Sequence, residues 1–95
     1  MAHSHLRSFR RRAFKQQRGF CYYCCLPMWE DDEAAFTARF GLSARLTRLL
    51  RSTAEHVVAR CDGGRDARPN IVAACHWCNQ RRHYGRPDTA PTADA

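Results

Sequence analysis

The sequence contains no long hydrophobic run and almost no lysine. Its first twenty residues, "MAHSHLRSFRRRAFKQQRGF", are basic and interrupted, so we expect neither a signal peptide nor a membrane span there. This absence favours a cytoplasmic protein without a membrane partner. Lys15 is the only lysine, so the net charge of +7 comes almost entirely from arginine. Arginine presents a planar fork of donors that suits phosphate, so the charge fits a nucleic acid partner and equally fits a soluble basic surface with no specific partner.

The chain is also short. Its 95 residues make one small domain, and a domain of this size hides only roughly 60–65% of the surface of its unfolded chain. Small domains of this kind usually carry disulfides or a metal as a staple. The six cysteines could supply either one.

Four of the cysteines occur in two pairs, "CYYC" and "CHWC", which contain Cys21, Cys24, Cys75 and Cys78. Each C-x2-C turn places two sulfurs on one side of a metal, and two such turns give the tetrahedral thiolate set of structural zinc. Zinc bound at such a site contributes roughly 10–16 kcal/mol to folding, which could replace a missing core. The long intervening chain is no obstacle, because loop-closure entropy grows only logarithmically with length.

The alternative is a secreted protein with three disulfides, for which the chain offers no secretion signal. The two remaining cysteines, Cys25 and Cys61, are expected to be ordinary reduced thiols.

Composition and periodicity predict an order of elements. We expect a single domain over residues 1–86 and a proline- and alanine-rich tail over 87–95 that is disordered. Within the domain we predict a basic helix over 4–18, a first zinc knuckle over 21–25, a helical insert over 30–52 and a β-β-α unit over 53–84.

The insert is predicted to hold two helices. The acidic "EDDE" opens the first, whose inner face carries Phe36 and Phe40 and whose C-terminal cap is Gly41. Ser43 starts the second helix, with three leucines packed inward: Leu46, Leu49 and Leu50. The pair resembles a helix-turn-helix hairpin, although a plain packing insert is the preferred interpretation.

The β-β-α unit is predicted from "TAEHVVA" as a strand, a glycine-turned loop, "IVAAC" as a second strand and "CNQRRHY" as a helix. On that helix Asn79 and His83 are four residues apart, so both project from one face. Soft thiolates and hard oxygen ligands bind different ions. We therefore expect a second metal at Asn79 and His83, with Glu55 at the end of the first strand as a third ligand.

The segment "EHVVARCDGGRDARPNIVAACHWCNQRRH" closely resembles the HNH endonucleases, the ββα-metal nucleases. The likeness includes the acidic-His pair, the Gly-Gly loop, the Asn that precedes the second strand, and C-x2-C-N before a basic helix. The upstream "CYYC" matches the zinc-bearing subgroup. The resemblance implies an α+β fold, a small zinc-stapled ββα-metal domain, to which this chain adds helices at its N-terminus and between its cysteine pairs.

The resemblance also implies roles for individual residues. His56 corresponds to the general base that takes a proton from water, and Glu55 to the acidic metal ligand before it. Asn70 corresponds to the residue that braces the long loop and orients the base. Asn79 stands where the last histidine of the family name usually stands, which makes this an H-N-N variant. His83 matches a further ligand that some members use.

The implied activity is metal-dependent hydrolysis of phosphodiester bonds, most simply in double-stranded DNA. A carboxylate, an amide oxygen and an imidazole suit Mg²⁺, Mn²⁺ or a similar ion in addition to structural Zn²⁺. The alternative is a zinc-ribbon module that binds nucleic acid without cleaving it. In either case we expect arginines on the loop and the last helix to contact backbone phosphates: Arg60, Arg65, Arg68, Arg81 and Arg82.

Overall fold

The computed structural model describes residues 2–83, so the predicted tail over 87–95 lies outside the described residues. The fold is the predicted small α+β arrangement of helices around a two-stranded antiparallel sheet. None of the helices within residues 2–83 combines the length and apolar content needed to cross a bilayer. In chain order the main elements are α1 (Ala2–Gln16), α2 (Glu33–Phe40), α3 (Ala44–Leu49), β1 (Ser52–His56), β2 (Ile71–Cys75) and α4 (His76–His83).

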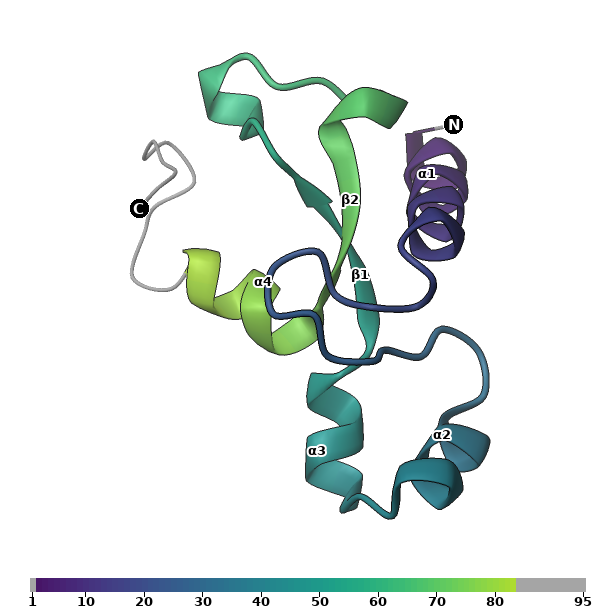
Figure 1. The fold of residues 1–95 in the computed structure, drawn as a ribbon. Coiled ribbons are helices and arrows are strands. Elements are labelled where there is room, and N and C mark those ends of the chain that lie inside the picture. Colours follow the sequence, from purple (N-terminus) through teal and green to yellow (C-terminus); the bar gives the residue numbers. More distant parts are fainter. Residues whose placement is uncertain (1, 84–95) are drawn as a thin grey trace.

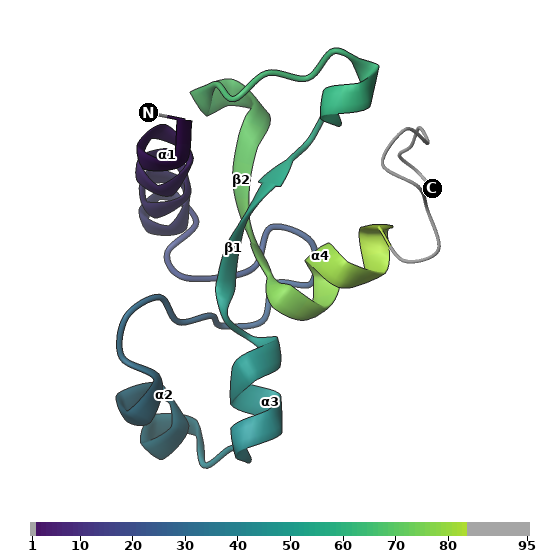
Figure 2. The same cartoon turned by 180° about the vertical axis from the view of Figure 1, so that it is seen from behind.

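The two strands form a twisted ribbon at the centre of the domain. Their register places Ser52 opposite Cys75 and His56 opposite Ile71. Helix α1 lies on one side of this ribbon and α4 on the other, while α2 and α3 lie together at one end (Figures 1 and 2). The long loop that joins the strands lies at the opposite end. The second half of the chain is therefore a β-β-α unit to which the first half contributes packing.

The core is built around sulfur rather than large apolar side chains. Its largest apolar member is Met28, and the other buried residues of the cluster are small: Ala13, Cys21, Ala73, Ala74, Cys75 and Cys78. Ala73 and Ala74 are completely buried, which allows α1 and the first cysteine loop to approach β2 closely. So little large apolar surface is buried that the fold fits the predicted need for a metal staple at the paired cysteines.

Gln17, just after α1, covers the outer edge of β2. Its side-chain Nε2 donates to the carbonyl of Ala73 at 2.8 Å, and its Oε1 accepts from the Ala73 amide at 2.9 Å. The amide of Tyr22 donates to the same carbonyl at 3.0 Å. At Ala73 these bonds replace those that a third strand would form, so the Gln17 side chain and the Tyr22 amide together satisfy this point on the edge of the sheet.

The predicted caps of the insert are confirmed. Asp32 caps α2 by accepting from the amide of Ala35, and Gly41 ends the helix in the left-handed region with φ of 63°. Ser43 caps α3 by accepting from the amide of Leu46. The pattern of polar caps in the sequence was sufficient here, because each bond is made within four residues.

The predicted inner faces of the insert were partly wrong. Phe36 is buried, but Phe40 is 41% exposed and Leu46 is 49% exposed. The buried position on α3 is Thr47, whose hydroxyl lies 3.0 Å from that of Thr37 and whose carbonyl accepts from the indole of Trp29. These polar contacts turn α3 so that Leu46 faces solvent.

The first strand ends earlier than predicted and the last helix begins earlier. Strand β1 ends at His56 rather than continuing through "VVA", and Val57 and Val58 are exposed. Helix α4 begins at His76, inside the second cysteine pair. The connecting loop contains two short 3-10 turns, η1 (Arg60–Asp62) and η2 (Arg68–Asn70).

Two adjacent positions of this loop favour glycine, each for a different structural reason. Gly63 has φ of 91°, a left-handed conformation that a side chain disfavours. Gly64 lies against the backbone, and a Cβ atom there would be 1.7 Å from the carbonyl oxygen of Val58. A side chain at Gly63 would therefore be strained, whereas at Gly64 the close approach to Val58 leaves no room for one.

Candidate metal and nuclease site

The four paired cysteines gather into one cluster, as predicted. The sulfur atoms of Cys21, Cys24, Cys75 and Cys78 all lie within 4.8 Å of one another. The Sγ atoms of Cys24 and Cys75 are 3.9 Å apart. Ligands about 2.3 Å from a tetrahedral zinc ion would be separated by about 3.8 Å, so the cluster has the size that zinc requires. All six cysteines of the chain are present as thiols, with Cys25 and Cys61 exposed and outside the cluster.

Backbone amides point at the sulfur atoms of this cluster. Cys21 Sγ accepts from the amides of Tyr23, Cys24 and Cys75 at 3.3–3.5 Å. Burial raises the pKa of the Cys21 thiol, but these backbone donors outweigh it and bring the pKa to about 7. Burial raises the pKa of Cys75 to about 11 and also raises the pKa of Cys78. One thiolate is thus favoured by the protein alone, and a divalent cation would be needed to ionise all four.

Glu55, the predicted acidic metal ligand, is buried at the end of β1 with only 2% of its surface exposed. Its Oε2 accepts from Nε of Arg82, on α4, at 2.6 Å. The Arg82 guanidinium also lies 4.3 Å from the centre of the Tyr23 ring. Burial raises the pKa of Tyr23 to about 12, so the phenol is neutral and the charge of Arg82 is balanced by Glu55. Arg82 was predicted to contact phosphate, and the structure places it on Glu55.

Asn79 reaches the same strand from α4. Its side-chain Nδ2 donates to the hydroxyl of Thr53 at 3.0 Å and to the carbonyl of Ala54 at 3.4 Å. Both bonds are made by the amide nitrogen. The amide oxygen, which is the atom that binds metals, takes part in neither of them. Glu55 and Asn79 therefore belong to one contact between β1 and α4. His83 is the last residue of α4, and its side chain lies outside the part of the chain that the structure describes.

His56, the predicted base, contacts the loop rather than α4. Its Nε2 lies 2.7 Å from Oδ1 of Asp66. Arg60 donates to both oxygens of the same carboxylate, from Nε at 3.2 Å and from Nη2 at 3.1 Å. These bonds to His56 and Arg60 lower the pKa of Asp66, so the carboxylate is ionised at neutral pH. Asp66 was missed by the sequence analysis, since its only signal was an acidic residue close to the glycine pair.

Asn70 joins the two ends of the loop. Its side-chain Oδ1 accepts from the amide of Val58 at 2.7 Å, and its Nδ2 donates to the carbonyls of Val58 and Arg65, both at 3.0 Å. Its own carbonyl accepts from the amide of Val57. Together these bonds fix the backbone that immediately follows His56.

The remaining predicted phosphate contacts are on the surface. Arg65, Arg68 and Arg81 are exposed. The Arg81 guanidinium lies 4.7 Å from the centre of the Trp77 ring, which is itself 44% exposed. Arg60 is exposed over most of its side chain but is held by Asp66. Arg65, Arg68 and Arg81 are therefore better placed to meet a polyanion than Arg60 and Arg82.

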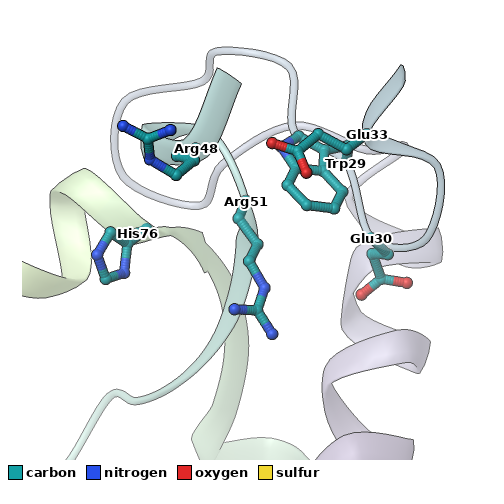
Figure 3. Close-up of a pocket in the computed structure, with 6 residues that line it drawn as sticks. All are labelled: Trp29, Glu30, Glu33, Arg48, Arg51 and His76. Carbon is teal, nitrogen blue, oxygen red and sulfur yellow. The ribbon is translucent and has the colours of Figure 1, made fainter. Parts of the chain in front are cut away.

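A separate hollow lies where the insert meets the start of β1. It is lined by Trp29, Glu30, Glu33, Arg48, Arg51 and His76. Figure 3 shows Arg48 and His76 on one side of this hollow and Trp29 with Glu33 on the other. None of the predicted site residues lines it, so the hollow is distinct from the contact between β1 and α4.

Comparison with known proteins finds a match to one family model in the second half of the chain. The model of the family described as HNH endonuclease matches residues 45–85, which span α3, both strands, the connecting loop and α4. No curated protein and no solved structure matches the chain significantly. An HNH domain indicates a nuclease or nucleic-acid-binding role, and the cysteine cluster adds a candidate zinc site.

Proposed function

We propose that this protein is a metal-dependent endonuclease that hydrolyses phosphodiester bonds of DNA, supported by the match of the HNH endonuclease family model to residues 45–85. The observation that carries the proposal is the arrangement at the end of β1. His56 and Glu55 are adjacent there, and Asn79 is bonded to the same strand from α4. The resemblance described above implies catalytic roles for all three residues, and they occur inside the segment that the family model matches.

The donor set fits a hard divalent cation. Glu55 offers a carboxylate and Asn79 an amide oxygen, both of which suit Mg²⁺ or Mn²⁺, and we propose His83 as a further ligand. Arg82 engages one oxygen of Glu55, but a carboxylate has about four lone-pair sites, so it can accept a cation as well. Such an ion would polarise the phosphate and stabilise the departing oxygen.

The residues of the chain itself perform the remaining tasks. We assign His56 as the general base, because an imidazole is largely neutral at cellular pH and can take a proton from the attacking water. Asn70 holds the loop backbone beside His56 through its bonds to Val58 and Arg65. Arg65, Arg68 and Arg81 are proposed to bind phosphates of the DNA backbone, which orients the substrate without reading its sequence.

A plasmid assay tests this proposal. Supercoiled plasmid is incubated with the protein and Mg²⁺ or Mn²⁺, with and without EDTA, and nicked and linear forms are measured. We expect nicking that depends on the divalent ion and is abolished by His56→Ala. His76→Ala is the matched control, since His76 lies in the separate hollow and should retain activity (Figure 3).

One observation favours a second candidate, a zinc-stapled module that binds nucleic acid without cleaving it. The contact of 2.6 Å between Arg82 and Glu55 already neutralises the proposed metal ligand. Retention of plasmid in a gel-shift assay, without nicking at any divalent ion tested, would support this candidate and contradict the nuclease.

A further inference from the structure

We propose that Asp66 is the positioning residue for His56, fixing the ring tautomer in which Nε2 carries the proton and Nδ1 is the basic atom. The inference rests on the proposed function, in which His56 is the general base. Asp66 belongs to the connecting loop and was not among the residues that the sequence singled out.

The contact between the two side chains is short and specific. His56 Nε2 and Asp66 Oδ1 are 2.7 Å apart, with 18% and 29% of the two side chains exposed. An ionised carboxylate can only accept hydrogen bonds, so the proton of this bond must lie on Nε2. In the neutral ring the other nitrogen then has its lone pair available, which is what a base requires.

Asp66 is itself held in place. Arg60 donates a hydrogen bond to each oxygen of the Asp66 carboxylate. Such a two-point contact with arginine fixes the orientation of the carboxylate and also favours its ionised form. Arg60 lies at the start of η1, and Asp66 follows the glycine pair that turns the loop back. The loop therefore holds the Asp66 carboxylate in a fixed orientation beside the ring of His56.

The arrangement separates two tasks between two carboxylates. Glu55 is buried and contacts α4 through Arg82, whereas Asp66 comes from the loop and contacts His56. Side chains of adjacent residues in a strand point to opposite faces, so Glu55 contacts Arg82 and His56 contacts Asp66. One carboxylate thus serves the proposed metal and the other serves the base.

Asp66→Asn tests the proposal because an amide can donate or accept and no longer dictates the tautomer. Nitrogen-15 NMR of the imidazoles, at a pH where the ring is neutral, reports which ring nitrogen is protonated. We expect the Nε2–H tautomer in the wild-type chain and a mixture in the variant. We also expect plasmid nicking to fall by about 10²-fold or more, since loss of the tautomer-fixing Asp of a Ser-His-Asp triad lowers kcat by about 10⁴-fold.

Asp62→Asn is the matched control, since Asp62 is an exposed aspartate of the same loop and should change neither readout. Amide NMR spectra and zinc content verify that both variants fold. A wild-type ring in the Nδ1–H form, or an unchanged tautomer in Asp66→Asn, would overturn the proposal. Absence of nicking by the wild-type chain would instead count against the proposed function, while the NMR result would still decide the role of Asp66.

Discussion

Arg82 Nε lies 2.6 Å from Glu55 Oε2, which joins α4 to the end of β1 through an ion pair whose acidic member is almost completely buried. A buried carboxylate is costly unless it is paired, so this guanidinium stabilises the site in the absence of a metal. The same carboxylate is the proposed anionic metal ligand. The proposed function therefore predicts that folding and metal binding are coupled at Glu55.

Replacing Arg82 by Ala should destabilise the protein and make its stability depend on divalent ions. Loss of the guanidinium removes the ion pair of 2.6 Å to a buried carboxylate, and breaking a buried pair costs about 3–5 kcal/mol of unfolding free energy. Mg²⁺ or Mn²⁺ should recover part of that loss, because the ion supplies positive charge to the same carboxylate. Urea unfolding with and without the ion measures both effects.

The control for this experiment is Arg81→Ala on the same helix. Arg81 is exposed and stacks on Trp77, so its loss should change stability by less than about 1 kcal/mol. Equal destabilisation by the two variants would contradict the assigned importance of the pair between Arg82 and Glu55.

Removal of zinc should unfold the chain. The buried core consists mainly of cysteine and alanine, so a strong chelator or Cys78→Ser should abolish the cooperative unfolding transition seen by circular dichroism. Cys25→Ser, at an exposed thiol outside the cluster, should leave the transition unchanged. A chelated protein that keeps its fold would show that the cluster is not the structural staple.

Gly64→Ala should damage the connecting loop more than Gly63→Ala. A methyl group at Gly64 would collide with the carbonyl of Val58, so the backbone of the loop must shift. At Gly63 no atom lies within 4 Å of the added carbon, and only the strained φ costs about 1 kcal/mol. Nicking rates of the two variants should separate clearly, and equal rates would mean that the loop tolerates the displacement.

The proposed phosphate contacts predict a change in salt dependence. Arg81→Ala should weaken DNA binding to a similar extent for all sequences and reduce the slope of log K against log salt concentration by about 1. Fluorescence anisotropy with a labelled duplex over a range of salt concentrations measures this slope. Glu33→Gln, on α2, is a suitable control, and a loss of slope in that variant alone would place the DNA elsewhere.

The sequence predicted those features of the fold that depend on short spacings. The strand "IVAAC" is observed at residues 71–75, and the caps at Gly41 and Ser43 are where the pattern placed them. The four-cysteine cluster was also predictable, because C-x2-C fixes the geometry of each half regardless of the chain between them. Each of these features is decided within a few residues.

The features that could not be predicted depend on the path of the chain between distant residues. Nothing in the sequence indicated that Gln17 would bond the edge of β2, or that Arg82 would face Glu55 rather than solvent. Asp66 reaches His56 only because the loop turns at the glycine pair. Val57 and Val58 have strong β propensity, yet strand pairing stops at His56. The segment opposite them, just before β2, forms the 3-10 turn η2 instead of a strand.

The most direct measurement is the single-turnover nicking rate of supercoiled plasmid by the wild-type chain, His56→Ala and His76→Ala at saturating Mg²⁺ or Mn²⁺. Loss of a general base should lower the rate by about 10²–10⁴-fold in His56→Ala, with His76→Ala close to the wild-type rate and all rates abolished by EDTA. Nicking by His56→Ala at the wild-type rate, or no divalent-dependent nicking by the wild-type chain, would contradict a nuclease centred on His56.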